Sequence, residues 1–155
     1  MRIPYYNLGP APANYLKLFP QRPTILRPQI KVVLRYQQRK YRILALVDSG
    51  SDFCLFSKGV ADVLGITVRT GESLPVTGIG GGRIPFFFHD IEILLDCYHI
   101  KTKAGFATTE IGTAGLLGQY GFFENFLVTF DYQNNQIELK KPGLIHHLTA
   151  RLRPS

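Results

Sequence analysis

The sequence predicts an all-β protein whose strands close into a barrel, with one or two short helices. From residue 29 onward, short runs rich in branched apolar residues follow one another closely. Turn residues such as Gly, Asn and Asp separate these runs, a pattern typical of small barrels. The chain has 155 residues, of which 45% are hydrophobic and 19% charged, and this composition is typical of one folded domain with a hydrophobic core.

The N-terminal segment, residues 1–28, differs from the rest of the chain. It carries six prolines and shows little helical or strand periodicity. We therefore expect an extended arm, either a removable pro-segment or a strap that docks on the body through its aromatic residues. The predicted domain follows at residues 29–141, and residues 142–155 form a basic C-terminal tail.

Within the predicted domain, each element has its own local signal. Residues 30–34 and 41–47 form a hairpin, and residues 57–65 form a short helix with a serine N-cap and a terminating glycine. We expect strands at 66–68, 74–77, 84–95 and 98–107, with the last two joined at Asp96–Cys97. We also expect a short helix at 120–125 and a final hairpin of 126–132 with 137–139 that turns at Asn134–Asn135.

Several classes of protein are disfavoured by composition. The apolar runs are far shorter than the ~20 residues of a membrane-spanning helix, and the first residues lack a signal peptide's apolar region. We therefore expect a cytoplasmic protein with no membrane association. Cys54 and Cys97 lack metal-ligand spacing and are interpreted as buried free thiols, so the sequence indicates neither a metal nor a cofactor.

Charge is distributed unevenly along the chain. Residues 1–47 hold nine Lys and Arg and no acid, residues 48–139 hold five bases and eleven acids, and the remainder carries four bases. Basic ends are typical of nucleic-acid binding. Because no basic motif is interleaved with aromatic residues, we favour basic segments that lie on the acidic body of the same or a partner subunit.

The candidate catalytic residue is Asp48, which ends the apolar run 44–47 and precedes Ser49 and Gly50. A second apolar run, 53–56, follows. A carboxylate held between hydrocarbon segments must be hydrogen-bonded, neutralised or used chemically, although Asp-Ser-Gly also occurs as an ordinary polar turn.

Two carboxylates that share one proton form an acid–base pair able to activate water. The chain has no second Asp-Ser-Gly, so it supplies half of such a pair. A two-fold axis through the site would supply the other half, and the sequence therefore predicts a symmetric homodimer.

At these residues the sequence resembles the retropepsin-like aspartic proteases. Residues 45–52, Ala-Leu-Val-Asp-Ser-Gly-Ser-Asp, resemble the active-site motif of that family. Residues 77–82, Thr-Gly-Ile-Gly-Gly-Gly, resemble its glycine-rich flap tip, and residues 115–118, Gly-Leu-Leu-Gly, resemble the segment beneath the catalytic loop. The three features occur in the family's order and span roughly residues 30–140.

The resemblance implies an acid-protease-type barrel and an aspartic endopeptidase that acts on peptide or protein substrates. Asp48 from each subunit would form the catalytic pair, Ser49 would brace the opposite loop, and Gly50 would offer its carbonyl oxygen to the substrate. The resemblance also implies a set of substrate-binding residues: Asp52, Ile79, Gly80, Gly81 and Leu116.

The sequence departs from the family pattern at Gln119. Family members often carry an arginine there, paired with the acid equivalent to Asp52. The main alternative function is a catalytically weak or inactive dimeric module that binds extended peptides on the same fold. A nucleic-acid-associated protein is a further alternative.

Overall fold

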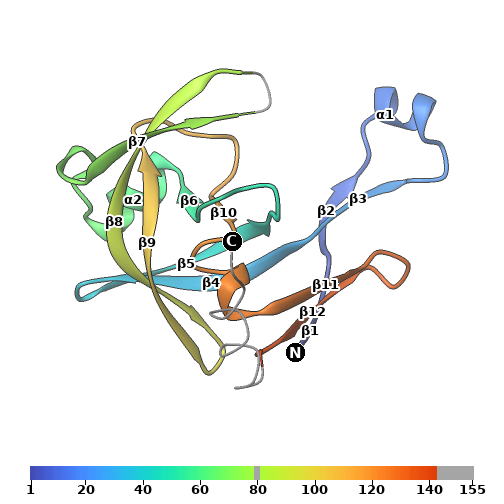
Figure 1. The fold of residues 1–155 in the computed structure, drawn as a ribbon. Coiled ribbons are helices and arrows are strands. Elements are labelled where there is room, and N and C mark those ends of the chain that lie inside the picture. The colour runs from blue at the N-terminus through green and yellow to red at the C-terminus, as the bar shows by residue number, and fades with distance from the viewer. Residues whose placement is uncertain (79–80, 143–155) are drawn as a thin grey trace, which may run out of the picture.

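The computed structural model describes residues 1–78 and 81–142, and its main body is a closed β-barrel (Figure 1). Seven strands pair in the order β4-β5-β10-β6-β9-β8-β7, and β4 also pairs with β8, which closes six of them into a ring. The predicted fold class is confirmed. The seven strands are β4 (Gln29–Tyr36), β5 (Arg39–Val47), β6 (Leu55–Phe56), β7 (Glu72–Thr77), β8 (Arg83–Leu95), β9 (Tyr98–Ala107) and β10 (Gly115–Leu117).

Alternating side chains bring β4 and β5 together. Ile30, Val32 and Leu34 on β4 are buried, and the residues between them are more exposed. The two strands are antiparallel and meet at a two-residue turn that follows the pair Tyr36–Arg39. The predicted hairpin is confirmed, and its second strand ends one residue before Asp48.

The longest hairpin joins β8 to β9 through a two-residue turn after the pair Leu95–Tyr98, as the sequence predicts. β7 pairs antiparallel with the first half of β8, from Glu72–Phe88 to Thr77–Arg83. β7 and β8 therefore form a second hairpin that projects from the barrel, and its turn contains the glycine-rich segment.

The described helices are short. α2 (Lys58–Leu64) begins after Ser57 and ends at Gly65, whose φ of 71° is left-handed, so the prediction for 57–65 is confirmed. At 120–125 the structure has the 3-10 helix η2 (Phe123–Asn125), which is shorter than the helix we expected. The predicted strand at 66–68 is wrong, because a second 3-10 helix, η1 (Val68–Thr70), begins there.

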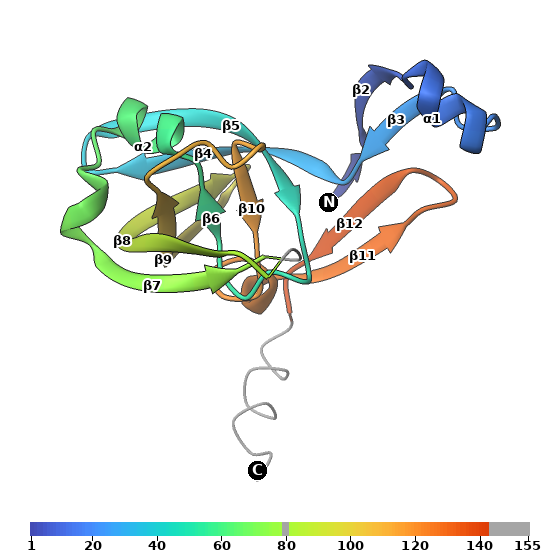
Figure 2. The same ribbon diagram turned by 90° about the horizontal axis from the view of Figure 1, so that it is seen from above.

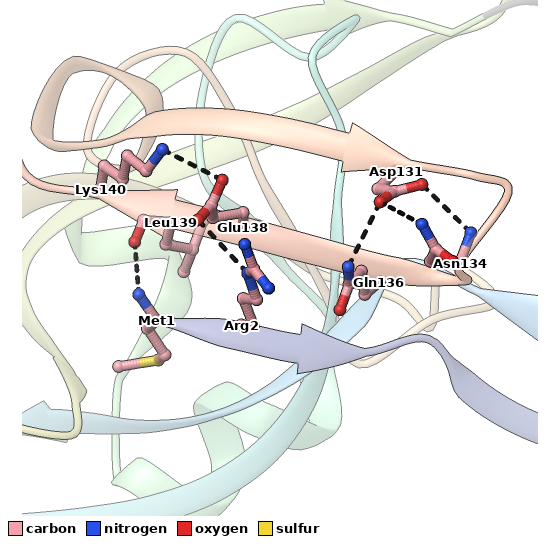
Figure 3. Close-up of polar contacts among 8 residues, drawn as sticks. All are labelled: Met1, Arg2, Asp131, Asn134, Gln136, Glu138, Leu139 and Lys140. Atoms are coloured by element: carbon pink, nitrogen blue, oxygen red, sulfur yellow. Dashed lines mark hydrogen bonds and ion pairs between the residues drawn. The ribbon is translucent and has the colours of Figure 1, made fainter.

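A separate three-stranded sheet forms from both ends of the described chain. β1 (Arg2–Pro4) pairs with β12 (Gln136–Lys140), which also pairs with β11 (Leu127–Asp131). Figure 3 shows how the backbone of Met1 joins Leu139, where the amino group donates to the carbonyl oxygen at 2.8 Å. The final hairpin around Asn134–Asn135 is as predicted.

Residues 1–28 are not an irregular extended arm. After β1 come β2 (Tyr6–Pro10), the helix α1 (Ala13–Leu18) and β3 (Thr24–Arg27), and β2 pairs with β3 as a two-stranded sheet. Figure 2 shows this N-terminal hairpin (residues 6–27) standing clear of the barrel. The C-terminal tail expected at 142–155 lies outside the described residues from 143 onward.

Two sequence expectations concern burial and membrane association. Both cysteines are free, but only Cys54 is buried, so the interpretation of Cys97 as a buried thiol is wrong: it lies exposed in the β8–β9 turn. No helix in residues 1–78 and 81–142 has the length and hydropathy needed to span a membrane.

The turn between β11 and β12 depends on the carboxylate of Asp131. It accepts hydrogen bonds from the side-chain amide of Asn134 at 2.8 Å, the backbone N–H of Asn134 at 3.1 Å and the amide of Gln136 at 3.2 Å (Figure 3). These bonds hold the pKa of Asp131 below its ordinary value.

Because unfolding removes these bonds, Asp131 titrates near pH 4 in the unfolded chain and lower in the folded protein. Their stabilisation is complete above about pH 4 and is lost as the pH falls through the lowered pKa. We expect Asp131→Asn to reduce the free energy of unfolding more at pH 7 than at pH 3, measured by urea denaturation. The exposed Asp90, changed to Asn, is the matched control, and an equal loss at both pH values would contradict this account.

Candidate active site

Asp48 lies at the point where β5 leaves the barrel. β10 runs parallel to β5, with Leu116 opposite Leu46 and Leu117 opposite Val47. The backbone N–H of Asp48 then donates to the carbonyl oxygen of Leu117 at 3.1 Å. The barrel therefore fixes the backbone of Asp48 directly, and its side chain is half-buried.

The residues after Asp48 form a tight turn around its carboxylate. The N–H of Gly50 donates to Asp48 Oδ1 at 2.9 Å, and the N–H of Ser51 donates to the Asp48 carbonyl oxygen at 3.3 Å. Ser49 and Gly50 are exposed. One backbone donor thus orients the carboxylate, and the turn presents its outer face to solvent.

The loop formed by residues 48–54 wraps around the segment after β10. The N–H groups of Gln119 and Tyr120 donate to the carbonyl oxygens of Ser51 and Asp52, both at 2.8 Å. The Tyr120 ring stacks on that of Phe53, with centroids 5.7 Å apart. Backbone and aromatic contacts therefore fasten residues 48–54, the Asp48 loop, to β10 and to the segment that follows it.

Gly118 makes this close approach possible. A Cβ atom on Gly118 would lie 2.2 Å from the carbonyl oxygen of Phe53 and 2.6 Å from that of Ser51. Because both obstacles are backbone atoms, no side-chain movement could relieve the clash.

Gln119 holds the Asp48 loop in a way that the sequence alone did not reveal. Its side-chain amide donates to the carbonyl oxygen of Ser49 at 2.6 Å. The sequence marked Gln119 only as a departure from the family pattern at Asp52. This hydrogen bond depends on the conformation of the flexible Gln119 side chain, which no local sequence pattern specifies.

Asp52 lies on the same loop and borders a surface groove. It is exposed, and together with Glu124 it lines an open groove of about 400 Å³ whose other lining residues are Gln119, Tyr120 and Phe123. Among the ion pairs of the described residues, none includes Asp52. The groove therefore carries two carboxylates without a described basic partner.

Leu116 connects the loop to the projecting hairpin. It packs, half-buried, against an apolar cluster that includes Phe86 and Phe88 from β8. Phe53 packs against the same cluster. The centroids of the Phe53 and Phe88 rings are 5.1 Å apart, and the two rings meet edge to face. Apolar side chains therefore extend from the Asp48 loop to the base of the β7–β8 hairpin.

The glycine-rich turn is described only in part. The N–H of Gly81 donates to the carbonyl oxygen of Gly78 at 2.9 Å, and Gly81 has a left-handed φ of 74°. Ile79 and Gly80 lie outside the described residues. The strands leading to this turn stand above the segment after β5 in Figure 1, and the same parts overlap when seen from above in Figure 2.

The side chains near Asp48 offer oxygen acceptors and hydroxyl groups rather than a metal-binding set. Within residues 1–78 and 81–142, no group of three or more His, Cys, Asp or Glu is placed to hold a metal ion. What the arrangement offers chemically is one oriented carboxylate on a rigid turn, next to apolar surface.

Comparisons with known proteins establish the fold. A scan against protein-family models finds no match, and neither does a search of curated proteins. Among solved structures, the chain is similar to a retropepsin-like aspartic protease from Rickettsia conorii, with a TM-score of 0.53 and 15% identity over 70% of this chain and 88% of that one. It is also similar to the retroviral protease-like domain of Ddi1 from Leishmania major, with a TM-score of 0.50 and 17% identity over 72% and 88% of the two chains. The fold is therefore retropepsin-like, as the sequence resemblance implied.

The close contact at Gly118 generates a stability prediction. We expect Gly118→Ala to lower the free energy of unfolding by about 1–3 kcal/mol, because the loop must move to admit the methyl group. Gly82→Ala is the matched control, since nothing lies within 4 Å of a Cβ at Gly82. Chemical denaturation measures both variants, and equal stabilities would contradict the packing described at Gly118.

Cys54 reports on the closure of the Asp48 loop. Its thiol donates to the Tyr120 carbonyl oxygen at 3.3 Å, and burial raises the pKa of Cys54 to about 11. We expect iodoacetamide at pH 8 to modify Cys97 and to spare Cys54 until the protein is unfolded, as measured by peptide mass spectrometry. Modification of both cysteines at the same rate in the folded protein would show that the loop is open.

Proposed function

We propose that this protein is an aspartic endopeptidase that works as a homodimer. The observation that carries the proposal is a single Asp-Ser-Gly turn, fixed to the barrel by the pairing of β10 with β5, on a retropepsin-like fold. A carboxylate of this kind becomes an acid–base catalyst when a second carboxylate lies beside it. The second copy of Asp48 is that partner.

In the proposed reaction, the two Asp48 carboxyl groups share one proton and bind a water molecule between them. The ionised group takes a proton from the water, and the resulting oxygen nucleophile attacks the peptide carbonyl carbon. The protonated group donates to the carbonyl oxygen, giving a tetrahedral intermediate without a covalent bond to the enzyme. Transfer of a proton to the amide nitrogen then breaks the C–N bond, and the apparent pKa values belong to the pair.

The other site residues have supporting roles. Ser49 braces the catalytic loop of the partner, and the exposed carbonyl oxygen of Gly50 accepts a hydrogen bond from the substrate backbone. Asp52 binds the substrate main chain further from the scissile bond, beside the groove that it lines with Glu124. Gln119 is a positioning residue, because it holds the Ser49 carbonyl oxygen.

The β7–β8 hairpin is the proposed flap. Its turn, with Ile79, Gly80 and Gly81, closes over an extended peptide that is bound as an added strand. The apolar cluster around Leu116 and Phe86 lies between this hairpin and the catalytic loop. We therefore expect apolar side chains to be preferred next to the scissile bond.

The direct test is Asp48→Asn. We expect peptide cleavage to fall by about 10²–10⁴-fold, because the amide can neither accept nor return the proton. Activity is measured on a broad peptide library between pH 3 and 8, and a statine-type transition-state mimic should inhibit the wild-type protein. Sedimentation velocity should show that the variant remains a dimer.

Asp62→Asn is the matched control, since Asp62 is an exposed acid on α2 that pairs with Lys58. Full activity in Asp48→Asn would refute the catalytic role. A wild-type dimer that binds library peptides without cutting any of them would replace the protease with the peptide-binding module.

A further inference from the structure

The N-terminal hairpin, residues 6–27, has very little core of its own. Ala11 is its one buried hydrophobic residue, and α1 buries none. A two-stranded sheet is marginally stable alone, and so is a helix of six residues. The hairpin therefore needs further contacts to be a stable structure.

Large apolar side chains are nevertheless exposed on this hairpin. Leu18 is 75% exposed and Leu8 is 51% exposed, and Tyr6 and Phe19 are exposed as well. Phe19 packs against Tyr15 within the hairpin, with ring centroids 5.0 Å apart. Exposed apolar groups gathered on one projecting element are typical of an interaction surface.

The base of the hairpin is firmly attached beside the candidate active site. The N–H of Val47, the residue before Asp48, donates to the carbonyl oxygen of Pro28 at 2.9 Å. Further contacts join the hairpin to the β11–β12 turn. The N–H of Tyr5 donates to the carbonyl oxygen of Asn135 at 2.7 Å, and the Arg22 guanidinium lies over the Tyr132 ring, 5.6 Å from its centroid. The hairpin is thus held at a fixed position relative to the Asp48 loop.

The direction of the hairpin identifies its partner. In Figure 1, the segment that follows β5 lies between the barrel on one side and the hairpin on the other, and Figure 2 shows the hairpin projecting away from the barrel. A two-fold axis that pairs Asp48 with its copy must pass next to this segment. The second subunit then occupies the side on which the hairpin projects.

Charge favours the same partner. Residues 6–27 contain Lys17, Arg22 and Arg27 and no acid, whereas residues 118–139, which include η2, β11 and most of β12, contain three acids and no base. A basic hairpin is therefore complementary to this acidic part of another copy.

We propose that the N-terminal hairpin is an assembly arm that packs on a second copy of this chain. The exposed side chains of Leu8, Leu18 and Phe19 supply its apolar contact, and Lys17 supplies charge complementarity. Because half a site lacks its second carboxylate, the arm controls activity by controlling assembly. This inference rests on the proposed function.

The test is Leu18→Asp, with Val63→Asp on α2 as the matched control, since Val63 is 49% exposed on the barrel. Sedimentation equilibrium gives the dimer dissociation constant. We expect Leu18→Asp to raise it about tenfold or more and Val63→Asp to leave it unchanged. Lys17→Glu should also raise it, and circular dichroism melting checks that each variant is folded.

The outcomes separate the two proposals. A wild-type dimer that cleaves peptides, with an unchanged dissociation constant in Leu18→Asp and Lys17→Glu, would overturn the arm and leave the protease standing. A dimer weakened by both variants but without cleavage in the wild type would support the arm and overturn the protease. A wild-type protein that stays monomeric at every concentration would overturn both.

Discussion

The parallel pairing of β10 with β5 determines where the Asp48 carboxylate lies. The pairing brings the Leu117 carbonyl oxygen to the N–H of Asp48. The chain after β10 then follows the Asp48 loop closely enough for the N–H groups of Gln119 and Tyr120 to bond to it. Gly118 permits that approach, because any side chain there would meet backbone atoms. The position of one carboxylate thus derives from the barrel and not from the loop alone.

In the proposed dimer, each chain supplies one well-built half of the site. The turn orients Asp48 through a single backbone donor and leaves Ser49 and Gly50 exposed. Exposed backbone at the tip of a rigid turn is suited to contact with another chain. The uneven charge of the sequence agrees with this view, since the basic N-terminal hairpin and the acidic residues 118–139 attract each other between copies.

Much of the barrel follows from local sequence patterns. Alternation in β4 and the two-residue turn between β8 and β9 are short-range signals, and so is the glycine that ends α2. The strand predicted at 66–68 failed because Thr70 bonds back to the Thr67 carbonyl oxygen through both its N–H and its hydroxyl group, which closes a 3-10 turn.

The N-terminal hairpin was missed for a different reason. Its pairing joins Tyr6 to Arg27, far apart in the sequence, and its prolines suggested irregular structure. Pro4 and Pro10 lie at the ends of their strands, where a missing N–H costs little. At the site, the sequence identified Asp48 and its turn, but the contact from Gln119 to Ser49 depends on side-chain geometry that a sequence pattern does not contain.

The central claim is that one active site requires an Asp48 from each of two chains. Mixing wild-type protein with an equal amount of Asp48→Asn, under conditions where subunits exchange and all chains are dimeric, tests it most directly. If the site is shared, only wild-type pairs are active, and the peptide-cleavage rate falls to about one quarter of that of the same total amount of wild-type protein. A fall to about one half would mean that each chain works alone, and would contradict the shared site.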